Sequence, residues 1–289
     1  MSDLLSEQGS LLDVFTPETI DDLEFVRNTI KPLIERNALF VVNHSGGKDS
    51  QAMYAVIREL VPDSQIVVMH AELPEADWDG LREHIEDNVV DTTPLLYTRA
   101  KKTFWDMVLH RGMFPSPQYR QCTSDLKRGP LEKLIRHYLK DHPDHNGLVV
   151  NCTGIRGEES NARAKAQPWK YSKQNSKAGR EWYDWLPIHG HLIGDVWKLI
   201  EQSGQYRHWA YDEGMSRLSC VFCIMSNKSD LRTAARLRPD QYRRVVMTER
   251  KIGHTMMMPR KGMEPQTLDQ IVGIPIENLE VEAPSAHVA

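Results

Sequence analysis

A glycine-rich turn between a buried strand and a helix constrains the fold of this chain more than any other feature. Residues 38–43 (ALFVVN) form a short apolar run rich in β-branched side chains, which is typical of a buried strand. The turn of residues 44–47 follows, and a helix opens near Asp49 with an apolar face of Met53, Val56, Ile57 and Leu60. Residues 65–70 (QIVVMH) are the next strand. This order is a βαβ unit, which implies a parallel sheet with a right-handed crossover.

Further runs continue this alternation of strands and helices. Strands are predicted at 94–98 and 148–153, and helices at 17–36, 79–89, 102–111, 128–141, 195–203 and 239–250. Pro32 should kink or shorten the first helix. Residues 167–182, rich in Lys, Gln, Ser and Gly, are predicted to be a mobile loop, and the tail after Pro259 to be irregular. The fold class is therefore α/β, a mostly parallel sheet with helices on both faces.

A chain of 289 residues can hold one large α/β domain with smaller additions. The pattern predicts a helical segment over 1–36, an α/β domain over 37–225, and a helical or irregular extension over 226–289. A small helical C-terminal part that carries cysteines is expected to accompany the α/β fold.

Charge is distributed unevenly along the chain. The net charge of −4 argues against generic binding to nucleic acids or membranes. Residues 1–24 carry seven acids and no Lys or Arg, and the residues after Lys261 carry five acids and again no Lys or Arg. The middle of the chain is therefore net basic, which suits an anionic substrate.

The N-terminus predicts neither a leader nor a membrane anchor. The first fifteen residues have no basic region and no long apolar run, and no stretch approaches the roughly 18 apolar residues of a membrane span. Four cysteines are too few for a secreted disulfide scaffold of this length. These features predict a cytoplasmic protein with reduced thiols.

The turn itself has the chemistry of a phosphate site. Gly46 and Gly47 let the backbone approach a ligand closely, and the helix N-terminus after them favours phosphate oxygens. Lys48 supplies a mobile positive charge, and Ser45 and Ser50 supply hydroxyl donors. We expect a nucleotide at Ser45–Ser50, with Asp49 as the residue that approaches a Mg²⁺ ion.

The string Ser45–Ser50 (SGGKDS) resembles the signature of the PP-loop ATP pyrophosphatases (adenine nucleotide alpha hydrolase-like superfamily), and within them the phosphoadenosine-phosphosulfate (PAPS) reductase family. Four further segments match this family in its order: Met69–Glu72, the Cys122 region with Lys127 and Pro130-Leu131, Gly154–Arg163, and Pro187-Ile188 followed by Asp195-Val196-Trp197. The resemblance runs from about residue 38 to about residue 225. It implies a PAPS reductase-like PP-loop domain over 37–225.

The resemblance also implies residue roles. The ligand would be ATP, or PAPS or its dephosphorylated form APS, held by Ser45–Ser50 with the adenosine near His70 and Glu72. A second element would contribute Gly154, Arg156, Ser160 and Arg163. Together with Mg²⁺, Lys48 and Arg156 would stabilise charge on a departing pyrophosphate, so Lys48, Asp49 and Arg156 are the candidate catalytic residues.

Arg156 and Arg163 also invite an interpretation from their spacing. They are seven positions apart, so they share one face if the segment is helical, and a pair of guanidinium groups suits phosphate or sulfate. The alternative is that both pair with Glu158 and Glu159 as surface charge.

The cysteines are candidate metal ligands. Some reductases of the family bind a [4Fe–4S] cluster through a Cys-Cys pair and a C-x-x-C motif, and here Cys122, Cys220 and Cys223 match while Gln121 takes the remaining place. Cys152 is either the fourth ligand or a buried core thiol. Zinc or a plain dithiol are the alternatives to a cluster, since thiolate-rich sites suit both metals. A cluster on three thiolates would leave one iron open for sulfide.

The function expected from these features is adenylation-linked sulfur transfer, in which ATP yields AMP and pyrophosphate. The family's C-terminal nucleophilic Cys has no counterpart after Cys223, which speaks against the alternative of a PAPS or APS reductase. A non-catalytic nucleotide-binding regulator is a third hypothesis.

Two kinds of macromolecular partner are also expected. A sulfur-donor protein such as a cysteine desulfurase would supply the sulfur, and a nucleic acid is one candidate acceptor. Residues 161–182 interleave basic and aromatic side chains, which suits single-stranded nucleic acid or, equally, a solvated lid over the nucleotide.

Overall fold

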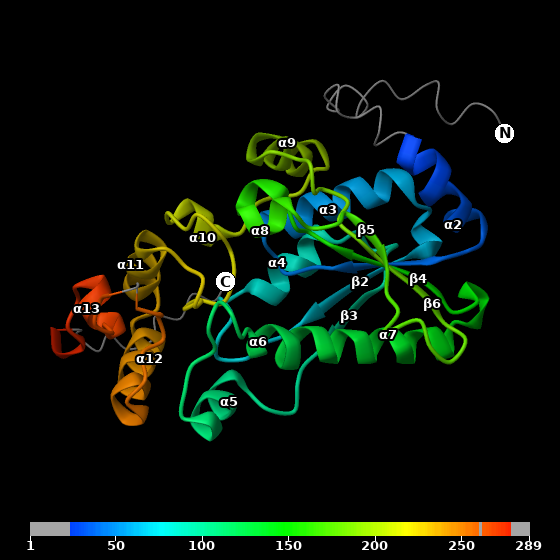
Figure 1. The fold of residues 1–289 in the computed structure, drawn as a ribbon. Coiled ribbons are helices and arrows are strands. Elements are labelled where there is room, and N and C mark those ends of the chain that lie inside the picture. Colours follow the sequence, from blue (N-terminus) through cyan, green and yellow to red (C-terminus); the bar gives the residue numbers. More distant parts are fainter. Residues whose placement is uncertain (1–23, 260–261, 279–289) are drawn as a thin grey trace.

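A six-stranded sheet organises the residues that the computed structural model describes, which are 24–259 and 262–278 (Figure 1). The strands stand in the order β3-β2-β1-β4-β6-β5. Their bounds are β1 (Leu39–Asn43), β2 (Ile66–Ala71), β3 (Leu95–Thr98), β4 (Leu148–Thr153), β5 (Trp169–Tyr171) and β6 (Glu181–Trp185). The pairings between these strands are parallel except that of β5 with β6, which is antiparallel.

Both faces of the sheet are buried, which explains why its central strand is a continuous apolar run. Leu39 and Val41 of β1 point into a core that α7 (Gly129–Asp141) covers. Phe40 and Val42 point into the larger core beneath α3 (Lys48–Leu60) and α9 (Ile193–Gln202). Figure 1 shows α3 and α9 on one side of the sheet and α7 on the other. The predicted α/β fold with helices on both faces is confirmed.

The strand order creates a topological switch point beside β1. The chain lays β2 and then β3 on one side of β1, and returns to place β4 on the other side. In parallel sheets such a reversal leaves a crevice at the carboxyl ends of the two central strands, where ligands bind. The turns that follow β1 and β4 are therefore the segments positioned to form a site.

The predicted helices are confirmed with ends shifted by a few residues. Besides α3, α7 and α9, they are α4 (Leu81–Asn88), α5 (Phe104–Arg111) and α12 (Pro239–Ile252). The first predicted helix appears as a π-helical turn, Val26–Ile30, followed by α2 (Lys31–Glu35), while residues 17–23 lie outside the described ranges. Pro32 at the start of α2 has no N–H to donate, and the change of helix type there agrees with the predicted disturbance.

Several short elements have no counterpart in the predictions. They are α6 (Gln121–Thr123), a π-helical turn at Ser124–Arg128, α8 (Asn161–Ala164), α10 (Trp209–Asp212), α11 (Lys228–Leu237), α13 (Leu268–Val272) and 3-10 turns at Asp63–Gln65, Pro143–His145, Gly157–Glu159 and Ile276–Asn278. The expectation of an irregular tail is thus wrong for α13, which packs with α11 and α12. Cys220 and Cys223 lie in the loop between α10 and α11 rather than in a helix.

The prediction of a mobile loop over 167–182 is also wrong. This segment contains β5 and the first residues of β6, joined as a hairpin at the edge of the sheet. Its aromatic side chains decide the structure: the Trp182 side chain is fully buried, and the rings of Trp169 and Tyr183 stack with centroids 4.8 Å apart. Burial of these rings outweighs the polar residues between the two strands.

None of the helices in the described ranges combines the length and the apolar character that crossing a bilayer requires.

Candidate functional site

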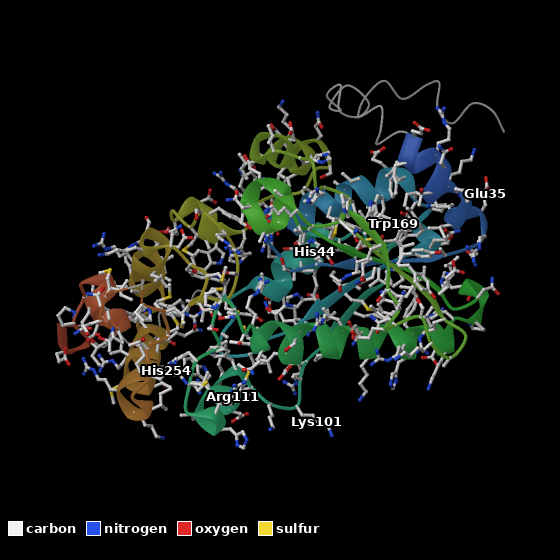
Figure 2. The ribbon with its side chains drawn as sticks, in the orientation of Figure 1. Glu35, His44, Lys101, Arg111, Trp169 and His254 are labelled. Carbon is white, nitrogen blue, oxygen red and sulfur yellow. The ribbon has the colours of Figure 1, made fainter. Side chains whose placement is uncertain are left out.

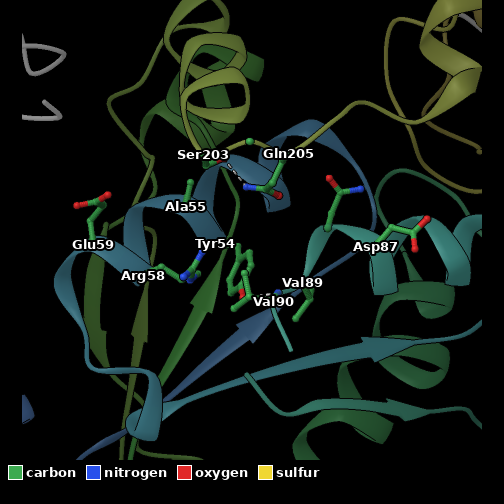
Figure 3. A pocket seen from close by; sticks show the side chains of 11 residues that line it. Tyr54, Ala55, Arg58, Glu59, Asp87, Val89, Val90, Ser203 and Gln205 are labelled. Carbon is green, nitrogen blue, oxygen red and sulfur yellow. Dashed lines mark hydrogen bonds between the residues drawn. The ribbon is translucent and has the colours of Figure 1, made fainter. Parts of the chain in front are cut away.

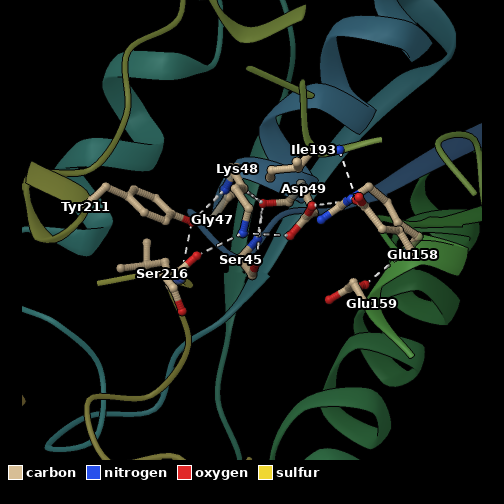
Figure 4. Close-up of polar contacts among 12 residues, drawn as sticks. Ser45, Gly47, Lys48, Asp49, Glu158, Glu159, Ile193, Tyr211 and Ser216 are labelled. Atoms are coloured by element: carbon tan, nitrogen blue, oxygen red, sulfur yellow. Dashed lines mark hydrogen bonds and ion pairs between the residues drawn. The ribbon is translucent and has the colours of Figure 1, made fainter. Parts of the chain in front are cut away.

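The turn after β1 is a rigid loop that ends in the N-terminus of α3 (Figure 4). Gly46 has a φ of +75°, and a Cβ there would lie 2.3 Å from Cδ1 of Leu81, so two constraints require glycine. The hydroxyl of Ser50 accepts the N–H of Ser45 (3.1 Å) and donates to the carbonyl of Gly47 (2.7 Å). The Ser50 hydroxyl thereby ties the two ends of the loop together.

The three candidate catalytic residues meet at this loop. Arg156 Nε donates to Asp49 Oδ1 at 2.6 Å, and Lys48 Nζ lies 3.5 Å from Asp49 Oδ2. Arg156 also pairs with Glu158, whose carboxylate accepts the N–H of Ile193 at 2.9 Å. The side chains of Lys48 and Arg156 are only 8% and 5% exposed, so both charges are held in a largely desolvated site. The structure therefore brings Lys48, Asp49 and Arg156 together from β1–α3 and β4.

Gly154 brings the turn after β4 directly against α3. A Cβ at this position would lie 2.6 Å from the carbonyl oxygen of Asp49 and 3.1 Å from the nitrogen of Ser50. Only a residue without a side chain lets the two backbones approach this closely. Gly154 thus sets the distance across which Arg156 reaches Asp49.

Arg163 and Ser160 play a different part from Arg156. Ser160 has an extended backbone and caps α8, accepting the N–H of Arg163 at 3.3 Å, while the Arg163 side chain pairs with Glu159. The idea that Arg156 and Arg163 share a helix face is wrong, because Ser160 separates a 3-10 turn from α8 and Arg156 precedes both. Both arginines pair with acidic side chains, as the alternative interpretation expected. Of the two, Arg156 alone also contacts the loop Ser45–Ser50.

His70 and Glu72 stand at the end of β2, beside the loop. His70 Nδ1 lies 2.8 Å from the carbonyl of His44, and burial lowers the pKa of His70 below its usual value. The imidazole is therefore neutral at pH 7, with its proton on Nδ1 and a lone pair on Nε2. Glu72 accepts from Arg82 at 2.9 Å, and the Arg82 guanidinium lies 3.8 Å above the Tyr97 ring. His70 thus offers an acceptor, whereas the carboxylate of Glu72 is engaged.

Tyr211 is a site residue that the sequence did not reveal. Its hydroxyl oxygen accepts the N–H of Lys48, the first residue of α3, at 3.1 Å and that of Leu218 at 3.2 Å. Burial of the Tyr211 side chain raises its pKa to about 12, so the hydroxyl keeps its proton and can also donate. Lys48 and Tyr211 are 163 positions apart, and no motif connects them.

The segment after Tyr211 holds the Lys48 side chain as well. Lys48 Nζ donates to the carbonyl of Ser216 at 3.3 Å. Asp230, which is buried at the start of α11, accepts the N–H and the hydroxyl of Ser216 at 2.8 and 2.7 Å. The C-terminal region therefore supplies one wall of the site.

Three of the four cysteines gather around Lys127, which the predictions named only as part of a motif. The proximity of Cys220, in its thiolate form, and then of Asp77 raises the pKa of Lys127 against the effect of burial. Burial raises the pKa of Cys220 to about 12, although Lys127 acts in the opposite direction. Burial likewise raises the pKa of Cys122, and the neighbouring Cys223 adds to it. The raised pKa values of Cys122 and Cys220 favour their protonated, neutral thiols at pH 7.

These side chains do not form a metal site in their present arrangement. Over the described ranges, no three His, Cys, Asp or Glu side chains come close enough to hold a metal ion. Cys152 lies apart in β4, fully buried, with its thiol 3.6 Å from the carbonyl of Val150 and with Asp184 as its charged neighbour.

A separate hollow lies at the far end of α3 and is not part of this site (Figure 3). Its volume is about 330 Å³, and Tyr54, Arg58, Asp87 and Gln205 are among its lining residues. The Tyr54 hydroxyl bonds Thr93 at 3.1 Å and the N–H of Val90 at 3.3 Å. The C-terminal end of α3, beside this hollow, carries the negative pole of the helix dipole. Phosphate groups therefore favour the N-terminal end of α3, at Lys48.

Gly154 yields a prediction on the packing of the two turns. Gly154→Ala should push the turn after β4 away from Asp49, lower the free energy of unfolding by roughly 1–3 kcal/mol and weaken nucleotide binding. Chemical denaturation and nucleotide titration measure the two effects. Gly194→Ala in α9 is the matched control, because nothing lies within 4 Å of its Cβ. Equal behaviour of the two variants would show that the close approach at Gly154 is unimportant.

Tyr211 yields a second prediction. Tyr211→Phe keeps the ring but leaves the N–H groups of Lys48 and Leu218 without their acceptor, which should lower the free energy of unfolding by about 1–3 kcal/mol. Tyr171→Phe, at a side chain exposed on β5, should change it by less than about 0.5 kcal/mol. Denaturant unfolding measures the stability of both variants. An unchanged free energy of unfolding in Tyr211→Phe would contradict a stabilising role for these hydrogen bonds.

The sequence of the chain is similar to those of several known proteins. The phosphoadenosine phosphosulfate reductase domain family matches residues 39–226. An uncharacterized 37.8 kDa protein of Escherichia phage 186 is 28% identical over 167 residues, covering 57% of this chain and 48% of its own length. An uncharacterized protein of Methanocaldococcus jannaschii is 22% identical over 233 residues, covering 80% of this chain and 53% of its own. The chain thus spans about half the length of these curated relatives.

Solved structures resemble the chain more distantly. A PAPS reductase from Candida auris, in a phosphate complex, has a TM-score of 0.43 at 12% identity and covers 71% of this chain and 96% of its own. An FMN adenylyltransferase from Candida glabrata has a TM-score of 0.45 at 14% identity and covers 76% and 67%. The family match takes in well over half of the sequence, from β1 to the loop after Cys223. The chain belongs to the PAPS reductase family of the PP-loop superfamily.

Proposed function

We propose that this chain binds ATP at Ser45–Ser50 and couples its cleavage to AMP and pyrophosphate with sulfur transfer to an acceptor. The observation that carries the proposal is the meeting of Lys48, Asp49 and Arg156 at the N-terminus of α3. Two buried cations and a helix N-terminus at one point favour a polyphosphate. Their place, beside the crevice between β1 and β4, is where a parallel sheet binds ligands.

The first chemical step would form an adenylated acceptor. An acceptor oxygen attacks the α-phosphorus of ATP, the bond from that phosphorus to the pyrophosphate oxygen breaks, and pyrophosphate leaves. Lys48, Arg156 and the first N–H groups of α3 stabilise the negative charge that develops on the leaving group. Asp49 would hold a Mg²⁺ ion, which would supply further neutralisation of phosphate charge. The Nε2 lone pair of His70 suits a donor group of the adenine.

The second step would exchange AMP for sulfur. A sulfur-donor protein such as a cysteine desulfurase presents a persulfide, whose terminal sulfur attacks the acceptor atom that bears the adenylated oxygen; the bond to that oxygen breaks and AMP leaves with it. A thiol reductant then attacks the donor sulfur of the resulting S–S bond, which releases the thiolated acceptor and forms a disulfide between the reductant and the donor. Lys127 interacts electrostatically with Cys122, Cys220 and Cys223, and Lys127 and Asp77 also interact with His70, which supports a common region for sulfur chemistry and nucleotide. A reducing cytoplasm, which keeps such thiols free, is the compartment that this proposal requires.

Nucleotide turnover tests the proposal directly. Purified protein incubated with ATP, Mg²⁺ and cell-derived RNA or DNA should release AMP and pyrophosphate, measured by chromatography and a coupled pyrophosphate assay. Lys48→Ala should lower this rate at least about 100-fold, because one preorganised charge on the leaving group is lost. Lys228→Ala, which removes an exposed lysine of α11, is the charge-matched control and should retain the rate.

The two alternatives predict other outcomes. A PAPS or APS reductase would release sulfite from the sulfonucleotide in the presence of a thiol reductant, and would leave ATP intact. A non-catalytic regulator would bind ATP with no product from either nucleotide. Either result in place of AMP formation would overturn the proposal.

Metal content decides the role of the cysteines. A [4Fe–4S] cluster on Cys122, Cys220 and Cys223, with or without Cys152, remains a prediction from the family resemblance. Anaerobically purified protein should then contain iron and sulfide near four each, absorb in the visible range, and lose both in Cys220→Ala. Cys152→Ala should retain them, because that thiol lies in β4 away from the others. A colourless protein that holds zinc or no metal would contradict the cluster.

A further inference from the structure

A cleft with cationic walls lies beside α5, outside the nucleotide site. Its volume is about 290 Å³, and its lining residues are Ala100, Lys101, Lys102, Met107, His110, Arg111, Asp125 and Leu126. Figure 2 shows Lys101 and Arg111 at the same end of the molecule. We propose that this cleft binds single-stranded nucleic acid, with a base on its floor and the flanking phosphates on its rim. The role as acceptor rests on the proposed function, whereas the binding itself does not.

The charges of the rim are available to a ligand. Lys101 and Lys102 are exposed, and among the described residues neither has a carboxylate within ion-pair distance. The Arg111 guanidinium contacts the sulfur of Met113 at 3.9 Å. Residues 99–120 contain five Lys or Arg and a single acid, Asp106, so the segment carries a charge of 5 − 1 = +4. Such a surface attracts phosphate groups.

The floor of the cleft distinguishes nucleic acid from a simple anion. Ala100, Met107 and Leu126 present apolar surface between the cationic side chains, and Met107 and Leu126 belong to the buried core. A free phosphate or an acidic peptide has no flat apolar group for such a floor, whereas a nucleobase has one. Tyr119, 66% exposed on the connection from α5 to α6, offers a stacking surface next to Arg120. Cations interleaved with apolar and aromatic surface are the pattern of single-strand recognition.

The position of the cleft links it to the candidate chemistry. Asp125 and Leu126 stand between Cys122 and Lys127 in the sequence, so the cleft is within about one helical turn of the thiol group. Arg99 to Lys102 follow β3 at the carboxyl edge of the sheet, the same edge that carries the nucleotide loop. A strand bound in the cleft would therefore run toward the region where AMP and sulfur are exchanged.

The other basic and aromatic segment, residues 161–182, is a weaker candidate. Trp182 is fully buried, and Trp169 is already stacked on Tyr183. Lys170 lies 3.8 Å from Asp184. Its rings are thus used within the fold, although Lys173 and Lys177 remain exposed. Lys173 and Lys177 therefore make the hairpin a suitable control for substitutions in the cleft.

Fluorescence anisotropy with labelled 12-nucleotide DNA and RNA strands tests the proposal on the full chain. Lys101→Glu/Lys102→Glu should weaken binding at least about tenfold. It should also flatten the dependence of log K on log salt by about 1.4, because roughly 0.7 is lost per phosphate contact on a single strand. Lys173→Glu/Lys177→Glu makes the same change in charge on the hairpin and should retain both the affinity and the salt slope. Unfolding midpoints check that both proteins are folded.

Three outcomes would overturn the proposal. An equal loss of affinity in Lys173→Glu/Lys177→Glu would show that the strand binds elsewhere or that binding depends on net charge alone. Equal affinity for an abasic strand would show that no base contacts the floor of the cleft. Equal competition by poly-glutamate would indicate an acidic protein partner. Release of AMP and pyrophosphate from ATP in the presence of cell-derived RNA or DNA, measured on the same proteins, separates the two proposals. Strand binding without AMP formation supports the cleft and overturns the proposed function, whereas AMP formation without strand binding at the cleft overturns only the cleft.

Discussion

The N-terminus of α3 is the constraint on which the rest of the structure depends. The first N–H groups of a helix have no partner within it, and here they are buried at the carboxyl edge of the sheet. Segments from distant parts of the chain converge to complete this point: the turn after β4 through Gly154 and Arg156, and the C-terminal region through Tyr211 and Ser216.

The charges at this point are balanced within the protein. Lys48 and Arg156 are both largely buried, and Asp49 and Glu158 compensate them. A bare cation pair in such surroundings would be costly, so the carboxylates hold the cations in position until a phosphate replaces part of that compensation. The site is thereby organised before a ligand arrives, because the forked guanidinium and the loop N–H groups already have fixed directions. Binding would then exchange partners with little rearrangement of the backbone.

Sequence reasoning captured what local pattern determines. The apolar runs of β1, β2 and β4, the turn at Ser45–Ser50 and the long helices follow from residues close together in the chain. It missed the β5–β6 hairpin because the polar residues between Trp169 and Trp182 conceal two short strands. It also missed Tyr211 and the Ser216–Asp230 contacts, since no spacing relates them to Lys48. Contacts that only tertiary packing creates have no local signal, and half of this site consists of them.

The hairpin at the edge of the sheet has a consequence for association between molecules. A parallel sheet that ended at β6 would present the outer N–H and C=O groups of a five-residue strand to any other extended chain. Instead the chain folds β5 back in the opposite direction, and this final strand is only three residues long, with Lys170 at its centre. So short and charged an edge gives an incoming strand little to pair with. The short antiparallel strand β5 therefore disfavours aggregation by strand pairing at this side of the sheet. It leaves the carboxyl ends of the parallel strands open for ligands.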